Sequence, residues 1–248
     1  MSAPIELPDV KTLIVPLDAA DALVLAWREL FGETPKLSSV FVLLAQEALE
    51  TGWWKACHCF NLGNAKSREG DGHDWTFFEC GENLSRALAE RIVAESGGLV
   101  TIKRYYDGGK SAEIKIKPKH PYCRFRAFRT LREGMIDYLG LLRRRFASAW
   151  PAVLAGDPKA FAIELSKAHY YTAPVEQYTS DLVSIFLHFG AKLPAGWTPD
   201  SVGEEDDEAQ AELGITAEDR KRIAGLVALT AKRMSDELFA PSQPDDVS

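Results

Sequence analysis

Residues 37–66 read LSSVFVLLAQEALETGWWKACHCFNLGNAK, and they begin with the most hydrophobic helix that the sequence predicts. From residue 38 to residue 51, apolar side chains fall on every face of a helix with about 3.6 residues per turn. A helix that is apolar all round is buried at the centre of a domain. Gly52 supplies a C-terminal stop, so the sequence predicts a buried central helix followed directly by two tryptophans.

Two glutamates stand near the end of this predicted helix. Glu50 lies in the last turn, where partial burial and the negative end of the helix dipole both disfavour a charged carboxylate. Both effects raise the pKa of Glu50, which suits an acid that donates a proton near neutral pH. Glu47 lies one turn earlier, and periodicity alone makes it an equal candidate for the exposed position.

The flanking sequence predicts an α+β domain that is mainly α, with one small β-hairpin. The hairpin is expected over residues 99–117, where partly alternating apolar residues flank the turn signal at Asp107–Gly109. A loop rich in Gly, Asn and Asp is expected from about residue 53 to residue 74. Helices are expected at about 18–31, 82–96, 125–146, 157–170 and 175–190.

Changes in composition divide the chain into four parts. Residues 1–36 are expected to form an N-terminal extension with a short helix, and residues 37–190 form the compact domain. Residues 191–215 carry prolines, glycines and an acidic run, which are typical of a linker. Residues 216–248 predict an amphipathic helix with a polar tail. Its apolar stripe, suited to a protein partner or to docking on its own domain, consists of Ile223, Leu226, Leu229 and Met234.

The overall charge argues against nucleic acid as a partner. The 248 residues are 46% hydrophobic, with a formal net charge of −7, so there is no general attraction for polyanions. One stretch, residues 115–132, is basic, but most such stretches are solvated. No secretory signal peptide and no membrane span are legible. We therefore expect synthesis in the cytoplasm without a signal peptide.

Four cysteines are too few for a disulfide framework in a chain of this length. The triplet Cys57–His58–Cys59, with Cys80 as a further ligand, gives a zinc alternative, although its spacing differs from the usual Cys-x-x-Cys knuckle. Buried thiols are the favoured interpretation, so neither a metal nor a cofactor is predicted. The fourth cysteine is Cys123.

Four motifs, in this order, resemble the glucosaminidase family: ALETGWWK at 48–55, NLGNAK at 61–66, FRAFRTLREGMIDYLGLL at 125–142 and YYTAPVEQY at 170–178. These are the mannosyl-glycoprotein endo-β-N-acetylglucosaminidase-like peptidoglycan hydrolases of glycoside hydrolase family 73. The resemblance covers about residues 38–187. It implies a lysozyme-like fold and an enzyme that hydrolyses the glycan strands of peptidoglycan.

The resemblance also implies catalytic roles. Glu50 stands at the glutamate of the first motif and would be the general acid, while Glu47 would be structural. The family's second acid precedes its hairpin turn, but the corresponding KRYY stretch here has no glutamate. A helix at about 82–96 is then interpreted as an insertion, and Glu79, in the TFFE stretch before it, becomes the second carboxylate. Glu82, Asp74 and Asp107 are further candidates for this role.

For substrate binding, the resemblance places Trp53, Asn61 and Tyr171 in the cleft, whereas Tyr178 is expected to pack. Trp54 stands where the family has a glycine, and it can form a stacking wall beside the acid. The aromatic side chains available to an extended cleft are Trp53, Trp54, Trp75, Phe128, Tyr170 and Tyr171.

The predicted activity is endo-N-acetylglucosaminidase cleavage of β-1,4 bonds, with muramidase and lytic transglycosylase as alternatives. A competing hypothesis is a catalytically inactive lysozyme-like module that binds cell-wall glycan or a protein partner. A third is an adaptor that works through the C-terminal helix. A wall hydrolase made without a signal peptide resembles a phage lysin, a virion component or a secretion-system cargo.

Overall fold

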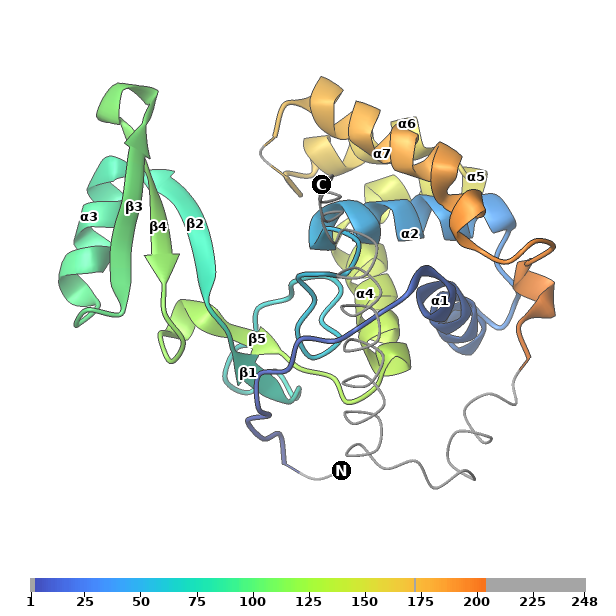
Figure 1. Cartoon of the computed structure of the whole chain (residues 1–248), viewed down its shortest axis with the longest axis horizontal. Coiled ribbons are helices and arrows are strands. Elements are labelled where there is room, and N and C mark those ends of the chain that lie inside the picture. Colours follow the sequence, from blue (N-terminus) through green and yellow to red (C-terminus); the bar gives the residue numbers. More distant parts are fainter. Residues whose placement is uncertain (1–2, 172, 204–248) are drawn as a thin grey trace, which may run out of the picture. The chain divides into compact units, whose positions relative to one another are not determined.

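The computed structural model describes residues 3–171 and 173–203 (Figure 1). The chain divides into two compact units, residues 1–202 and 203–248. The predicted C-terminal helix and the second part of the predicted acidic linker, residues 204–215, lie outside the described residues. The first unit is an α+β structure that is mainly helical, as the sequence predicts.

The predicted central helix is present as α2 (Leu37–Thr51), and ten of its fifteen residues are buried. It ends at Gly52, whose φ of 58° is the left-handed conformation that glycine adopts easily. Figure 1 shows α2 between α1 (Pro16–Phe31) and α7 (Val175–Phe189), and both helices contact it. The sequence therefore folds around α2.

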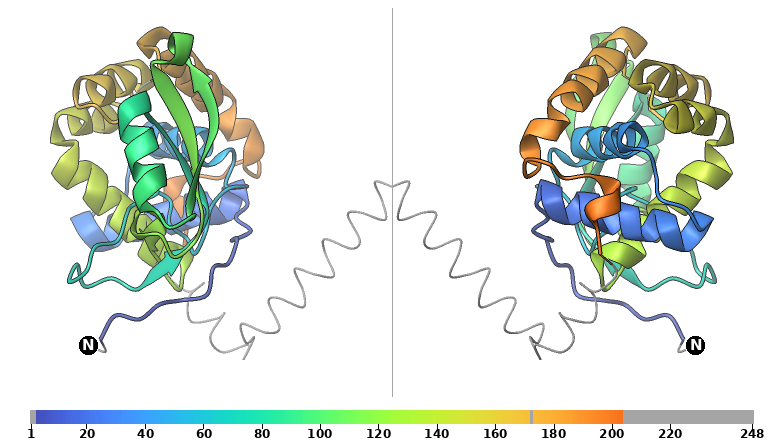
Figure 2. Two further views of the ribbon diagram at one scale, coloured as in Figure 1. Left: turned by 90° about the vertical axis from the view of Figure 1, so that its left-hand side faces the viewer. Right: turned by 90° about the vertical axis from the view of Figure 1, so that its right-hand side faces the viewer.

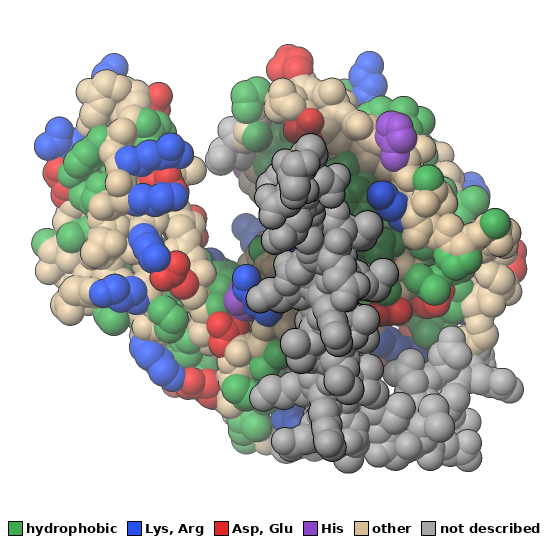
Figure 3. Space-filling view, in the orientation of Figure 1, with side chains coloured by type: hydrophobic (Ala, Val, Ile, Leu, Met, Phe, Trp, Pro, Cys, Tyr) green, Lys and Arg blue, Asp and Glu red, His purple; other side chains and the backbone are tan. Residues whose placement is uncertain are grey.

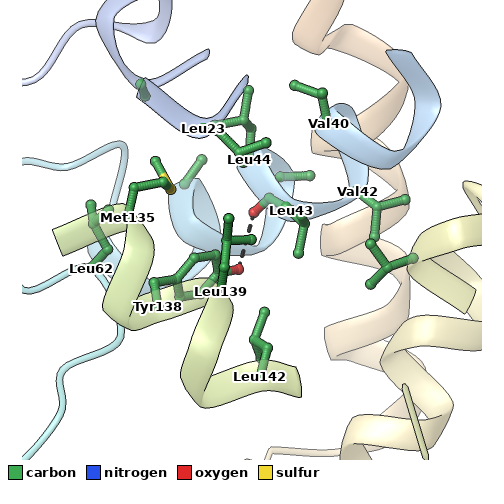
Figure 4. Packing of buried hydrophobic residues seen from close by; sticks show 14 of the residues in the cluster. Leu23, Val40, Val42, Leu43, Leu44, Leu62, Met135, Tyr138, Leu139 and Leu142 are labelled. Carbon is green, nitrogen blue, oxygen red and sulfur yellow. Dashed lines mark hydrogen bonds between the residues drawn. The ribbon is translucent and has the colours of Figure 1, made fainter. Parts of the chain in front are cut away.

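The core beside α2 is built from three helices (Figure 4). Leu43 and Leu44 on α2, Leu23 from α1 and Leu139 from α4 (Leu131–Arg145) belong to this core, and all four side chains are fully buried. Tyr138 on α4 donates a hydrogen bond from its hydroxyl to the backbone carbonyl of Leu43 at 3.4 Å. Each buried leucine contributes about 1.5–3 kcal/mol through removal of its apolar surface from water. Because α1 shares this core, it packs as part of the same unit.

The remaining helices complete the first unit. The predicted helices at 157–170 and 175–190 are present as α6 and α7, and a short α5 precedes them. The side chain of Asp157 caps α6 by accepting a hydrogen bond from the backbone N–H of Ala160. Among the described residues, every helix is too short or too polar to span a bilayer. The bounds are α5 (Trp150–Ala155) and α6 (Pro158–Lys167).

Two small antiparallel sheets follow the loop after α2. One pairs β1 with β5, and the other has the order β2-β4-β3. The predicted hairpin is confirmed as β3 and β4, and α3 covers one face of their sheet (Figure 2). We call β2, α3, β3 and β4 together the three-stranded lobe. The bounds are β1 (Trp75–Phe77), β2 (Cys80–Ser85), α3 (Arg86–Glu95), β3 (Val100–Tyr106), β4 (Ser111–Ile116) and β5 (Arg124–Arg126).

Two predicted helix boundaries were wrong, and sheet pairing explains both. The helix predicted at 82–96 begins only at Arg86, because the residues before it form β2 and pair with β4. The helix predicted at 125–146 begins only at Leu131, because its first residues form β5 and pair with β1. A capping box at Thr130 then starts α4.

Candidate active site

Glu50 projects from the last turn of α2, directly before an unusual turn. Gly52, Trp53 and Trp54 have positive φ angles of 58°, 59° and 60°. Residues other than glycine rarely adopt this backbone conformation, so the backbone is strained at both tryptophans. The turn reverses the chain just after the acid and directs Trp54, which is only 1% exposed, into the core.

A pocket of about 680 Å³ opens beside Glu50. Its walls come from the loop after α2, from β5, from the end of α4 and from the segment before α7. The pocket carries more basic than acidic side chains. It is lined by Glu50, Gly63, Asn64, Ala65, Lys66, Arg68, Asp71, Arg126, Leu141, Arg145, Phe146, His169 and Tyr170.

The surroundings of Glu50 favour its protonated form more than water does. Burial raises the pKa of Glu50, and hydrogen bonds from Tyr178 and Gln46 only partly offset that rise. The Tyr178 hydroxyl donates to Glu50 Oε1 at 2.8 Å. The ring of Tyr178 in turn stacks on Tyr171, with ring centroids 3.7 Å apart. The carboxyl is thus oriented by one hydroxyl and kept neutral over a wider pH range than an exposed glutamate.

Glu47 takes the buried position that the sequence left open. Its side chain is fully buried, and Oε2 accepts a hydrogen bond from Trp54 Nε1 at 3.1 Å. Burial raises the pKa of Glu47 to about 8, although the Trp54 hydrogen bond opposes that rise. Oε1 has no hydrogen-bond partner among the described residues. Trp54 therefore supports Glu47 from within the core rather than lining the pocket.

Asn61 shapes the pocket by fixing its loop. The side chain is 1% exposed and makes three hydrogen bonds. Its Nδ2 donates to the carbonyls of Ala65 at 3.0 Å and Arg126 at 2.9 Å, and its Oδ1 accepts from the N–H of Ala65 at 2.8 Å. These bonds tie the loop that carries the pocket residues to β5, so Asn61 acts on the site through the backbone.

Of the aromatic residues that the sequence places in the cleft, Tyr170 lines this pocket, whereas Trp53, Tyr171 and Phe128 lie outside its lining. Trp53 is half-buried and stacks on Phe189 at 5.8 Å. Tyr171 stacks on Tyr178, and its hydroxyl donates to the carbonyl of Ala162 at 2.9 Å. Phe128 lines a separate pocket of about 500 Å³. Tyr171 therefore packs against Tyr178, which donates the hydrogen bond to Glu50.

Two candidate second acids, Glu79 just before β2 and Glu82 on β2, lie in different environments. Glu79 is about half exposed, and it forms a 2.9 Å ion pair with Lys115 outside the lining of the Glu50 pocket. Glu82, on β2, forms a 3.4 Å ion pair with Lys66. It lines a second pocket of about 680 Å³ that shares Lys66 and Arg68 with the first. The structure thus places Glu82, but not Glu79, in a pocket that shares lining residues with the pocket of Glu50.

Asp71 is a carboxylate that the sequence analysis did not single out, and it lines the same pocket as Glu50. Burial alone would raise the pKa of Asp71, but the backbone N–H groups of Arg68 and His73 and the Arg126 guanidinium outweigh it and lower the pKa. Both N–H groups lie 3.2 Å from the carboxylate oxygens. The charged run after the NLGNAK motif was the signal available for this residue.

Asp74 and Asp107, which the sequence also offers as the second acid, lie away from the Glu50 pocket. Asp74 pairs with Arg129 at 3.0 Å and lines the pocket that contains Phe128. Asp107 lies in the turn between β3 and β4. Neither carboxylate is therefore placed to act with Glu50 in this arrangement.

The zinc interpretation has no support in the described part of the chain. Within residues 3–171 and 173–203, no three His, Cys, Asp or Glu side chains form a group that suits a metal ion. Cys80 instead lies beside Cys123, with 3.3 Å between the sulfurs.

A Tyr178→Phe substitution tests the hold on the acid. Without the hydroxyl, the charged form of Glu50 loses its hydrogen-bond donor, so the pKa of Glu50 rises further. If Glu50 acts as a general acid, we expect the alkaline limb of the kcat/KM profile to move to higher pH. A Tyr171→Phe control keeps the ring stacking and should leave the limb in place. If the alkaline limb of Tyr178→Phe stays at the same pH as in wild type, the Tyr178 hydroxyl does not influence the titration of Glu50.

Comparison with known proteins gives weak similarities. No family model and no curated protein matches the chain. A C-terminally truncated glycoside hydrolase domain from Salmonella typhimurium FlgJ is 21% identical, with a TM-score of 0.40, over 71% of this chain and 98% of that one. A peptidoglycan hydrolase mutant from Sphingomonas sp. A1 is 22% identical, with a TM-score of 0.41, over 71% of this chain and 90% of that one.

Proposed function

We propose that the chain is a peptidoglycan hydrolase that cleaves β-1,4 glycosidic bonds with Glu50 as its general acid. The observation that carries the proposal is the placement of Glu50, an acid whose pKa is raised by burial, at the wall of an open pocket of about 680 Å³. The α+β organisation suits the lysozyme-like fold that the sequence motifs imply.

In the proposed reaction, Glu50 transfers its proton to the glycosidic oxygen as the bond from that oxygen to the anomeric carbon breaks. The Tyr178 hydroxyl then stabilises the carboxylate that remains. A water molecule or the acetamido oxygen of the sugar attacks the anomeric carbon. When water completes the reaction, its hydroxyl joins the anomeric carbon and its second proton returns to Glu50.

In this proposal a second carboxylate stabilises positive charge on the sugar ring. Three carboxylates are candidates for this role, and each has a different kind of support. Glu79 remains a prediction from sequence. Glu82 is supported by its place in the pocket that shares Lys66 and Arg68 with that of Glu50. Asp71 is supported by its lowered pKa beside an acid whose pKa is raised, because catalytic carboxyl pairs divide their roles in this way.

The charge of the cleft suits an anionic polymer. Four basic side chains line the Glu50 pocket of a chain whose net charge is −7. Among the described residues, neither Arg68 nor Arg145 forms an ion pair with a carboxylate. Figure 3 shows further Lys and Arg side chains in a row on the three-stranded lobe. Peptidoglycan carries carboxylates on its lactyl and peptide groups, so these cations are suited to hold it.

We propose endo-N-acetylglucosaminidase specificity, and fragment analysis tests it. Purified protein would be incubated with peptidoglycan, and mass spectrometry would identify the reducing ends. We expect N-acetylglucosamine ends. N-acetylmuramic acid ends would indicate a muramidase, and anhydro-muramic ends a lytic transglycosylase. Absence of fragments from correctly folded protein, across pH, would overturn the enzyme proposal.

One observation favours a second candidate, a non-catalytic glycan-binding module. Glu79, the second acid that the sequence predicts, is paired with Lys115 and lies outside the lining of the Glu50 pocket. Cosedimentation with intact peptidoglycan, performed beside the fragment analysis, separates the two functions. A module of this kind would bind the wall and release nothing.

A further inference from the structure

Two of the four cysteines lie together although they are far apart in sequence. The sulfurs of Cys80 and Cys123 are 3.3 Å apart, and both thiols are free. Cys80 is partly exposed and Cys123 is buried. Disulfide formation needs a sulfur–sulfur distance of about 2.05 Å, so a shift of about 1.3 Å would bring the sulfurs to bonding distance.

The pair stands where the three-stranded lobe joins the rest of the unit. The chain leaves β1 at Phe77 and enters β2 at Cys80, and it returns from β4 through Cys123 into β5 at Arg124. Figure 1 shows β2 and β4 rising from the level of β1 and β5. We call this crossing, residues 78–80 and 117–123, the neck. Its two strands of chain meet at the sulfurs.

Contacts around the sulfurs hold them in register. Cys123 Sγ lies 3.3 Å from the carbonyl of Ile116, and Cys80 Sγ lies 3.7 Å from the carbonyl of Tyr122. Lys66 also donates to the Tyr122 carbonyl, at 2.6 Å, and its Nζ is 3.7 Å from Cys80 Sγ. The neck is therefore joined to a residue that lines both pockets of the cleft.

We propose that Cys80 and Cys123 are a site of thiol oxidation, at which a disulfide fastens the neck of the three-stranded lobe. The other two cysteines do not offer such a site. Cys59 donates from its sulfur to the carbonyl of Pro8 at 3.3 Å, and Cys57 lies in the main core.

The oxidant is a disulfide compound, such as glutathione disulfide or an oxidised dithiol oxidoreductase. Cys80, the more accessible sulfur, attacks one sulfur of the oxidant and releases the first thiol. Cys123 then attacks Cys80 Sγ and displaces the second thiol, to which its proton is transferred. Two protein thiols and one disulfide thus give one protein disulfide and two thiols. Burial raises the pKa of Cys123 to about 12, which favours Cys80 for the first attack.

Fastening the neck should act on both stability and the cleft. The lobe supplies Glu82, Leu84, Leu88 and Ile92 to the lining of the second pocket, while residues 66–69, 121, 122 and 124 supply the rest. A bond at the neck limits how far these parts of the lining separate. It also restricts the unfolded chain by closing a long loop, which raises the melting temperature by roughly 5–10 °C.

The test compares the full chain in reduced form with the same chain treated with glutathione disulfide. Peptide mapping without reduction should yield one linked pair that contains Cys80 and Cys123, with Cys57 and Cys59 still free. Thermal unfolding should show the oxidised protein melting roughly 5–10 °C above the reduced protein. Cys80→Ser and Cys123→Ser single variants should melt at one temperature whether or not they are treated.

Three results would overturn the proposal. They are free thiols at both positions after treatment of folded protein, a bridge that uses Cys57 or Cys59, and a correct bridge that leaves the melting temperature unchanged. The comparison of the two wild-type forms stands even where a serine variant fails to fold. It also needs no hydrolytic activity, so its outcome is independent of the proposed function.

Discussion

We expect Glu50→Gln to lower kcat/KM on peptidoglycan by roughly 10²–10⁴-fold, the range that general acid catalysis supplies. The amide has the shape of the protonated acid but no proton to give to the leaving oxygen. Its carbonyl oxygen still accepts the hydrogen bond from Tyr178, so the fold of the site is retained. Initial rates of fragment release, with melting temperatures beside them, measure the effect.

The pH profile of the wild-type protein adds a second measurement. As the proposed general acid, Glu50 would have to be protonated to act, so we expect activity to fall as pH rises through its pKa, which burial raises. The descending limb should therefore lie at higher pH than an exposed glutamate gives. Activity in Glu50→Gln close to that of wild type would remove Glu50 from the mechanism.

Parallel variants at the other carboxylates make this test specific. Glu79→Gln, Glu82→Gln and Asp71→Asn each remove one charge and keep the side-chain shape. The second catalytic acid is the position whose loss lowers kcat by more than about 10²-fold while the protein remains folded. If none of the three does so, a mechanism in which Glu50 alone serves both steps is favoured.

The second large effect concerns stability and arises from Glu47. Its folded-state pKa is about 8, against a value near 4.5 when exposed. Between these values the folded protein binds more protons than the unfolded chain, so stability falls as pH rises from 4.5 to 8. The contribution of Glu47 to the free energy of unfolding is fully present below about pH 4.5. Its loss between pH 4.5 and 8 is roughly 3–5 kcal/mol.

Glu47→Gln should remove this dependence. The amide does not titrate and still accepts the hydrogen bond from Trp54 Nε1. We therefore expect the variant to gain stability relative to wild type as pH rises from 4.5 to 8. Free energies of unfolding from denaturant titrations at several pH values give the difference, in which other titrating groups cancel. Parallel curves for wild type and variant would contradict a buried neutral carboxyl.

A Glu47→Ala variant is the matched control for packing. It removes the acceptor for Trp54 and leaves a cavity in a fully buried position. We expect a loss of about 2–4 kcal/mol at about pH 5, where Glu47→Gln and wild type should be close. A small loss of stability in Glu47→Ala at this pH would show that neighbouring side chains move to fill the cavity.

Local sequence was enough to predict α2, its C-terminal stop and the β3–β4 hairpin, because helix periodicity and turn residues specify them directly. It was not enough for β1, β2 and β5. The residues of β2 precede a helix, and only their pairing with β4 makes them a strand. The residues of β5 have the apolar spacing of a helix but pair with β1. Long-range pairing overrode local preference in each case.

The candidate site divides in a similar way. Glu50 was predicted because its position at a helix end is local and its motif is recognisable. Asp71 and Arg145 were not, because they line the same pocket as Glu50 only after the loop and α4 have packed. Helix periodicity alone could not choose between Glu47 and Glu50 for the exposed position, and only the resemblance favoured Glu50. In the structure Glu47 is the buried one, and the indole N–H of Trp54 donates a hydrogen bond to it.

The neck has an evolutionary consequence. Because the three-stranded lobe departs from β1 and returns to β5 at a single crossing, its ends are already close together, as a domain insertion requires. Its small core, formed by residues such as Ala89 and Ile114, is separate from that around α2. Such a lobe can be exchanged, lengthened or shortened while the part that carries Glu50 is inherited unchanged, so the lining of the second pocket can change without a new fold.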